Sequence, residues 1–272
     1  MTKNLDYEGL RSIVNNYDIF YIDLWGVVHN GIILHKKAIE TLVEITIAKK
    51  NYVLLTNAPR PNKTVKLFLE KMKMDKEIRE KVYTSGEAAL NYLKKNHLGK
   101  KFYHIGPLKD FDLFLGLESY RTKNIDNSNY LLCTGLFDER DENLRYYKEL
   151  FKNNVNKKMI CTNPDLIVDR GKKRELCAGS VALIFEKMGG EVIYFGKPFP
   201  EVYNQAIENT GKKILSIGDN LNTDIKGANL LGYDSLLISN GIHKNEIKKN
   251  GIEKVAKKYE TVVNFIQSEL KW

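Results

Sequence analysis

The chain has 272 residues, of which 43% are apolar and 28% are charged, and its formal net charge is +9. This composition is ordinary for a globular protein and provides for one large core or two modest ones. Residues 1–11 are mostly polar and no run approaches the roughly 18 apolar residues of a membrane span, which excludes a secretory signal and a membrane protein and makes a cytoplasmic protein the expectation.

The positive charge raises the hypothesis of a nucleic-acid-binding protein. However, the lysines are dispersed in pairs such as Lys36-Lys37 and Lys248-Lys249, without the aromatic pattern or fold motif that base recognition needs. We therefore expect solvated helix faces and no nucleic-acid partner. A basic surface would still help to attract a small anionic substrate.

Helix and strand patterns alternate along the chain. Apolar residues recur at helical spacing over residues 38–47 and 65–72, which predicts amphipathic helices there. Strand-like apolar runs occupy residues 19–22, 52–55, 82–84, 102–105, 130–133, 159–162, 192–195 and 214–217. This alternation predicts an α/β fold whose core is a parallel, doubly wound, Rossmann-like sheet.

Several of these predicted strands lead directly into polar side chains. The groups are Asp23 after the first strand, Thr56 and Asn57 after the second, Lys197 after residues 192–195, and Asp219 and Asp224 after residues 214–217. Each group alone has a structural explanation as a turn, a helix cap or a surface residue. Because open α/β sheets bind ligands at the carboxyl ends of their strands, the joint occurrence favours one functional site.

In this order the segments resemble the motifs of the haloacid dehalogenase superfamily, whose hydrolases use an aspartate nucleophile. The resemblance assigns the motif positions to Asp23, Thr56, Lys197 and the pair Asp219 and Asp224. More narrowly, the chain is similar to class IIA, the nucleotide-, p-nitrophenyl- and pyridoxal-phosphatase-like enzymes. The narrower resemblance rests on residues 55–59, 163–165, 196–198 and 218–224.

The class IIA resemblance implies a cap domain between the second and third motifs. It predicts a discontinuous core of residues 1–86 and 187–272 and a C2-type α/β cap of residues 87–186. The cap would cover the strand-end site and select the leaving group. Asp165 and Gly179 lie in segments similar to those that face the substrate in the family, although a turn and a closely packed helix start would also explain them.

The resemblance also implies roles for the motif residues. Asp23 would attack phosphorus to form an aspartyl-phosphate, and Lys197 would offset charge on both the nucleophile and the phosphate. Thr56, with the backbone at Asn57, would hold phosphoryl oxygens and so bind the substrate.

Mg²⁺ is the cofactor that the resemblance implies, because its hard, partly hydrated shell suits carboxylates and a backbone carbonyl. The expected protein ligands are Asp23, Asp219 and the carbonyl oxygen of Trp25. Asp224 completes the acidic set, and we expect it to orient Lys197 or a metal-bound water rather than to contact the metal directly.

Trp25 departs from the phosphatase pattern, which has a second Asp at this position as general acid and base. An indole N–H only donates and does not titrate usefully, so it can perform neither function. His29 is the candidate replacement, because an imidazole can serve as acid and then as base and because this segment forms a flap over the site in the family. A polar turn residue is the alternative explanation of His29.

The sequence therefore predicts a Mg²⁺-dependent hydrolase of a small phosphorylated metabolite with a non-standard general acid. Trp25 keeps open the hydrolysis of another bond, phosphonate or carbon-halogen, whose leaving groups do not need the same proton. A catalytically silent ligand-binding protein that keeps the fold and the metal site is the third hypothesis. We expect a small anionic substrate as partner, no membrane association, and a monomer or homodimer.

Overall fold

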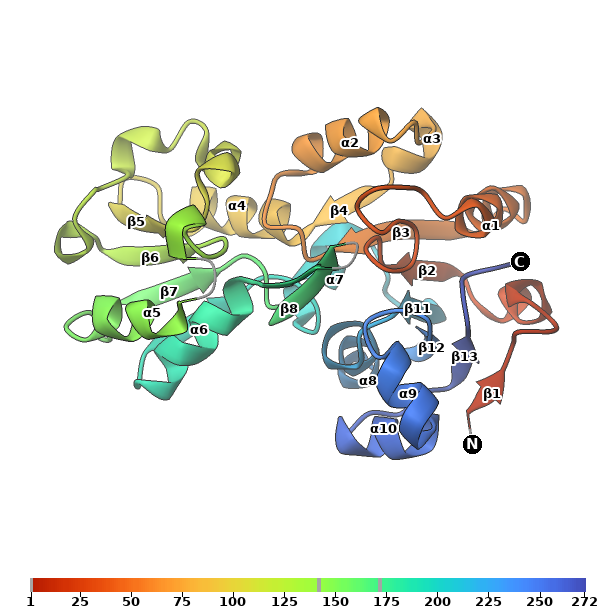
Figure 1. Cartoon of the computed structure of the whole chain (residues 1–272). Coiled ribbons are helices and arrows are strands. Elements are labelled where there is room, and N and C mark those ends of the chain that lie inside the picture. The colour runs from red at the N-terminus through yellow and green to blue at the C-terminus, as the bar shows by residue number, and fades with distance from the viewer. Residues whose placement is uncertain (1, 141–142, 171–172) are drawn as a thin grey trace.

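Strand β2, which precedes Asp23, is an inner strand of the larger of two parallel sheets in the computed structural model (Figure 1). The structure describes residues 2–140, 143–170 and 173–272. Within those ranges the larger sheet has seven strands in the order β1-β13-β12-β11-β2-β3-β4, and every neighbouring pair is parallel. The strands are β1 (Lys3–Asn4), β2 (Ile19–Ile22), β3 (Asn51–Thr56), β4 (Val82–Thr84), β11 (Ile214–Gly218), β12 (Asp234–Ile238) and β13 (Phe265–Gln267).

Helices cover both faces of this sheet, which explains why β2 is apolar along its whole length instead of alternating. Phe20 and Ile22 pack in one cluster with residues of α1 and α2, whereas Ile19 and Tyr21 pack in another with residues of α4 and α7. The helices of this lobe are α1 (Lys36–Ile47), α2 (Asn62–Lys71), α3 (Lys76–Arg79), α4 (Ser85–Asn96), α7 (Pro200–Ala206), α8 (Lys226–Leu231), α9 (Lys244–Asn250) and α10 (Ile252–Lys258).

A second lobe, which we call the cap, is inserted between β4 and β11 and lies at the left of Figure 1. In the described part of the chain its parallel sheet has four strands in the order β10-β7-β6-β5, and a separate antiparallel hairpin is formed by β8 and β9. The cap elements are β5 (Phe102–Ile105), β6 (Tyr130–Cys133), α5 (Leu144–Phe151), β7 (Lys158–Cys161), β8 (Ile167–Arg170), β9 (Lys173–Leu176), α6 (Ala178–Lys187) and β10 (Glu191–Tyr194). The predicted α/β fold, with a doubly wound parallel sheet and an inserted α/β unit, is confirmed.

Helix α4 packs against both sheets. Its Ala88, Ala89 and Leu93 belong to the apolar cluster that contains Tyr21 of β2 and Phe102 of β5. The helix begins at a sequence-encoded cap, because the Thr84 hydroxyl accepts a hydrogen bond from the N–H of Glu87. The two lobes therefore share one continuous apolar core on this side.

The strand predicted at residues 192–195 does not join the sheet that carries Asp23. It is β10, whose residues 191–194 pair in parallel with residues 158–161 of β7 in the cap. A division of the chain at residue 187 would separate β10 from its hydrogen-bonding partner. We therefore propose that the second boundary between cap and core lies after Tyr194, in the segment that carries Lys197.

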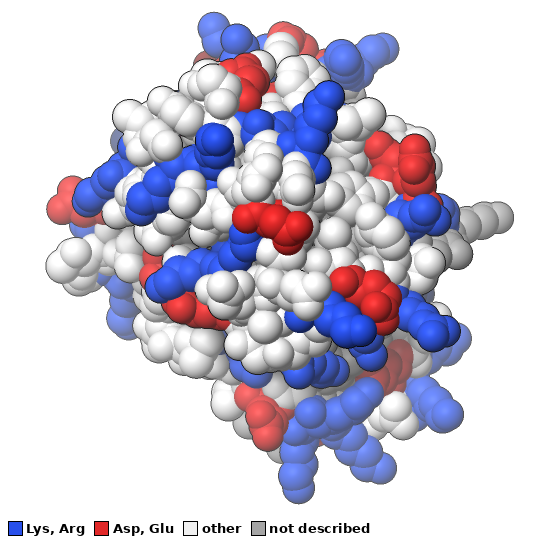
Figure 2. All heavy atoms as spheres, turned by 90° about the vertical axis from the view of Figure 1, so that its left-hand side faces the viewer, with Lys and Arg blue, Asp and Glu red and all other residues white. Residues whose placement is uncertain are grey.

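The surface at the cap end carries charge of both signs. Figure 2 shows Lys and Arg side chains dispersed over this face, with Asp and Glu side chains between them. Among the described residues, no helix has both the length and the apolar character needed to cross a membrane.

Candidate active site

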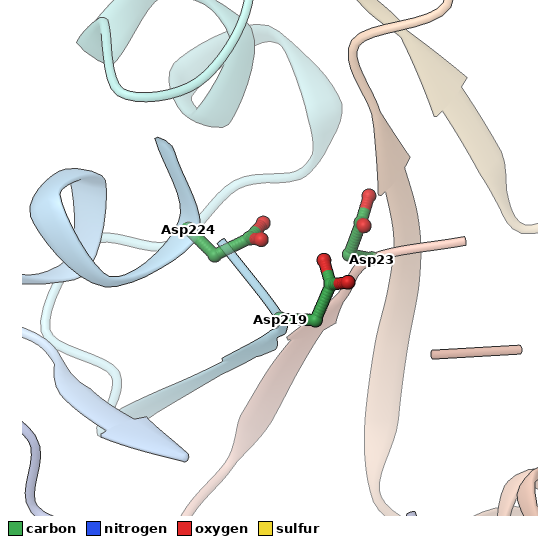
Figure 3. Close-up of side chains that lie close together, drawn as sticks. All are labelled: Asp23, Asp219 and Asp224. Atoms are coloured by element: carbon green, nitrogen blue, oxygen red, sulfur yellow. The ribbon is translucent and has the colours of Figure 1, made fainter. Parts of the chain in front are cut away.

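Asp23, Asp219 and Asp224 converge at the carboxyl end of the larger sheet (Figure 3). Asp23 follows β2 and Asp219 follows β11, and these strands are direct neighbours, with Ile22 opposite Ile217. Asp224 comes from a π-helical turn, η7 (Leu221–Ile225), that follows β11. One oxygen from each carboxylate lies within 4.8 Å of the others, and all three side chains are buried.

Lys197 binds two of these carboxylates. Its ammonium nitrogen lies 2.6 Å from Oδ1 of Asp23 and 2.6 Å from Oδ1 of Asp224. Burial alone would lower the pKa of Lys197, but the charges of Asp224 and Asp23 outweigh burial and raise this pKa above its ordinary value. Lys197 is therefore a fixed cation beside Asp23.

The Asn57 side chain holds the backbone of Lys197. Its Oδ1 accepts a 2.7 Å hydrogen bond from the N–H of Lys197, and its Nδ2 donates to the Lys197 carbonyl at 3.0 Å. Sequence reasoning gave Asn57 a substrate-binding role through its backbone and missed this function of its side chain. Thr56, which precedes it, is buried and lines the same cleft as Asp23.

The acidic cluster has the chemistry of a divalent-cation site. Burial raises the pKa of Asp219 to about 7, and the charge of Asp224 adds to the effect. Gly26 has a φ of 82° and approaches so closely that a Cβ atom there would lie 2.2 Å from Oδ2 of Asp219. Buried oxygen ligands with a net negative charge fit Mg²⁺, because a hard cation replaces the water that the carboxylates have lost.

Trp25 packs against residues 28–31 of the loop that follows β2, a segment that we call the flap. Gly31 has a φ of 84°, and a Cβ atom on it would lie 2.5 Å from Cη2 of Trp25, so the indole occupies the space that any other side chain would need. The ring of Trp25 also makes an edge contact with His29, with the ring centroids 5.2 Å apart. A packed aromatic ring thus fills the position two residues after Asp23.

His29 lines the cleft but is held in a largely apolar environment. It is 3% exposed and packs between Trp25 and Phe68, whose ring centroid is 5.8 Å from that of the imidazole. Its Nδ1 accepts a 3.0 Å hydrogen bond from the N–H of Gly31. Burial lowers the pKa of His29 to about 4, so the imidazole is neutral near pH 7 and a poor proton donor.

The candidate residues surround a cleft of about 880 Å³ between the core and the cap. Asp165 enters it from the cap, and its Oδ1 accepts a 3.1 Å hydrogen bond from Nδ2 of Asn57. Gly179 does not line the cleft. Gly179 packs instead against the turn that contains Pro164 and Asp165, and a Cβ atom on it would lie 2.2 Å from the carbonyl oxygen of Pro164. The predicted site residues that line the cleft are Asp23, Trp25, His29, Thr56, Asn57, Asp165, Lys197, Asp219 and Asp224.

A second contact between core and cap was not predicted from the sequence. Arg60, in the loop after β3, lies 3.7 Å from Oδ1 of Asp110 and 3.2 Å from Oδ2 of Asp112 in the cap. Nη2 of Arg60 also donates to the carbonyl of Lys109 at 2.6 Å. No motif marks these residues, because the partners are about fifty positions apart and of common types. They fix one wall of the cleft relative to Thr56.

Comparison with known proteins agrees with this architecture. Residues 20–115 match a family model described as haloacid dehalogenase-like hydrolase, and residues 194–264 match a second model of haloacid dehalogenase-like hydrolases. A solved hydrolase of the haloacid dehalogenase-like family from Brucella suis 1330 is 32% identical, with a TM-score of 0.77 over 86% of this chain and 93% of that one. The chain belongs to the haloacid dehalogenase-like hydrolase family.

Two curated relatives have named activities. A dihydroxyacetone phosphatase of Corynebacterium glutamicum (strain R) is 28% identical over an alignment 174 positions long, which covers 60% of this chain and 59% of that protein. The 5′-nucleotidase YutF of Bacillus subtilis (strain 168) is 24% identical over an alignment 273 positions long, which covers 93% of this chain and 99% of that protein. The first match thus spans less than two thirds of the relative, whereas the second spans nearly all of it.

Proposed function

We propose that the protein is a Mg²⁺-dependent phosphohydrolase that releases phosphate from a small phosphorylated metabolite through an aspartyl-phosphate at Asp23. The observation that carries this proposal is the ammonium of Lys197, bound to both Asp23 and Asp224 within a buried acidic cluster. A carboxylate repels an anionic phosphate ester, and a fixed cation beside the nucleophile removes that obstacle. The activities of the two named relatives support a phosphomonoester as substrate.

Each residue has a defined role in this proposal. Asp23 attacks phosphorus, Lys197 offsets the charge that gathers on the phosphoryl oxygens, and Thr56 donates its hydroxyl to one of them. Asp224 keeps Lys197 in place through the 2.6 Å ion pair. Mg²⁺, held by Asp23, Asp219 and the Trp25 carbonyl, would neutralise the phosphate when bound. Asn57 positions Lys197 through the two backbone hydrogen bonds.

A second function is favoured by one observation, the packed indole of Trp25 where a phosphatase has its acid. A phosphonate or carbon-halogen bond could be hydrolysed without that acid. A screen of phosphate esters, phosphonates and haloacids, with and without Mg²⁺, separates the two functions. Phosphate release that stops on chelation supports the phosphohydrolase, and metal-independent halide release would contradict it.

Metal binding is expected to depend on Asp219. Titration calorimetry should show Mg²⁺ binding to the wild type and strongly weakened binding to Asp219→Asn, because the amide removes one charge from the buried cluster. Asp138→Asn, which changes an exposed carboxyl at the outer part of the cleft, is the matched control and should leave the affinity unchanged. If the wild type has no affinity even with beryllium fluoride present as a phosphate analogue, the metal assignment is wrong.

A further inference from the structure

The proposed reaction needs a proton for the leaving group, and the segment that carries Asp23 and Trp25 does not supply it. An alkoxide leaving group must be protonated as its bond to phosphorus breaks, and the indole of Trp25 cannot provide that proton. His29 is enclosed by Trp25 and Phe68, and its Nδ1 already accepts from the N–H of Gly31. Burial disfavours the charged imidazolium that would give up this proton, so the carboxyl groups of the cleft are the stronger candidates.

Four carboxyl groups outside the acidic cluster line the described part of the cleft. Asp138 is exposed and accepts from the N–H of Leu108, and Glu175 lies on the hairpin strand β9. Asp110 faces the guanidinium of Arg60. Asp165 differs from the other three carboxyl groups, because it accepts a hydrogen bond directly from Asn57, the residue after Thr56.

Two hydrogen bonds hold the turn that carries Asp165. The N–H of Asp165 donates to Oδ1 of Asn163 at 2.9 Å, and its carbonyl accepts from the N–H of Gly179 at 3.1 Å. The lack of a side chain at Gly179 permits this approach of helix α6 to the turn. Because the leaving group departs in line on the side opposite Asp23, it moves away from the strand ends toward the cap, from which Asp165 projects.

We propose that Asp165 is the general acid and base of this enzyme, a catalytic residue that takes the role left vacant by Trp25. The proposal rests on the phosphohydrolase function stated above. In the first step Asp23 forms a bond to phosphorus, the bond from phosphorus to the leaving oxygen breaks, and the Asp165 carboxyl gives its proton to that oxygen. In the second step a water oxygen forms a bond to phosphorus as the Asp165 carboxylate takes a proton from that water, the bond from the Asp23 oxygen to phosphorus breaks, and inorganic phosphate leaves.

The surroundings of Asp165 suit a carboxyl that exchanges its proton near neutral pH. Burial raises its pKa to about 6, the charge of Lys197 and the hydrogen bond from Asn57 oppose the rise, and the charge of Asp224 adds to it. Asp219 also carries charge near Asp165. The Cys177 thiol at the start of α6 stays protonated, because burial raises its pKa. A bound phosphate ester adds negative charge and favours the protonated acid further.

The test is Asp165→Asn, because the Asn carboxamide oxygen can still accept from Asn57 while the proton is lost. Hydrolysis of an alkyl phosphate should fall by about 10²-fold or more, the usual scale of general acid catalysis. With p-nitrophenyl phosphate, whose leaving group needs little protonation, the variant should release a fast burst of one equivalent of p-nitrophenol and then turn over slowly. A burst of this kind would not arise from a merely structural defect.

Asp110→Asn is the matched control, since it changes another buried carboxyl of the same cleft whose pKa burial raises to about 6. It should leave the dependence on leaving group unaltered. An equal loss of kcat/KM with both esters in Asp165→Asn, or no loss of kcat/KM with either, overturns the role of Asp165 while the phosphohydrolase function stands. Absence of phosphate release by the wild type from any ester would overturn the function itself, and the Asp165 role with it.

If Asp165→Asn fails to fold, the wild type provides a second measurement. Its kcat/KM for an alkyl phosphate should fall as the pH rises through the pKa of the acid, because only the protonated carboxyl can protonate the leaving oxygen. The same limb should be absent with p-nitrophenyl phosphate. Identical profiles for the two esters would contradict the proposal.

Discussion

Asp23→Asn is expected to abolish turnover of every phosphate ester that the wild type hydrolyses. An amide cannot form an acyl-phosphate and places a neutral group against the metal, so the covalent route is closed. The loss in kcat should be about 10⁴-fold or more, the scale seen when a nucleophile is removed from other enzymes. Steady-state phosphate release, with trace amounts of contaminating phosphatase excluded, measures this effect.

The fold should survive this substitution, because Lys197 keeps its ion pair with Asp224. Asp18→Asn is the matched control, since Asp18 is exposed at the opposite end of the same strand and should tolerate the change with full activity. Acid quenching after brief exposure to a ³²P-labelled substrate should trap phosphoenzyme in the wild type and none in Asp23→Asn. Retention of most activity by Asp23→Asn would exclude the aspartate-nucleophile mechanism.

Trp25→Asp is expected to restore alkyl-phosphate hydrolysis to the Asp165→Asn variant. The new carboxyl would stand two residues after Asp23, where the phosphatase pattern has its acid, and the gain should be about 10-fold or more if the flap accepts the loss of the indole. In the wild-type background the same change should add little, because Asp165 already supplies the proton. Comparison of alkyl and p-nitrophenyl phosphates across the single and double variants measures the gain.

The alternative hypothesis, that His29 is the general acid, predicts a different result in this experiment. If His29 were the acid, His29→Ala would cripple alkyl-phosphate hydrolysis and Asp165→Asn would not. The burial that lowers the pKa of His29 to about 4 argues against that outcome near pH 7. No change of leaving-group dependence in any variant at positions 25, 29 or 165 would mean that none of them handles the proton.

The site residues at the strand ends could be predicted from the sequence, because each of them follows a strand-like run of residues. Asp23 directly follows the apolar strand β2 and Asp219 directly follows the largely apolar strand β11, and neighbouring parallel strands bring such residues to one edge. The neighbours of a strand within its sheet could not be predicted in the same way. The run at residues 192–195 gives no indication that it pairs with β7 rather than with the larger sheet, because an apolar pattern records burial and not partners.

Polar contacts between residues that lie far apart in the sequence could not be predicted either. The Asn57 amide binds Lys197 across 140 positions and Asp165 across 108 positions, and neither bond leaves a mark in the spacing of residues. The same holds for Arg60 and Asp110. The enclosure of His29 between two rings, which decides its protonation, depends on the fold of the flap and not on the segment that contains the histidine.

The shared helix α4 means that the cap is not a separable module. Excising the cap together with α4 would strip Tyr21 of the alanine and leucine side chains packed with it, and excising the cap without α4 would strip Phe102 of them, at about 25 cal/mol for each Å² of apolar surface exposed. The two lobes should consequently melt in a single calorimetric transition rather than two. Any chimera that is meant to change substrate range must carry α4 together with the residues of the larger sheet that it covers.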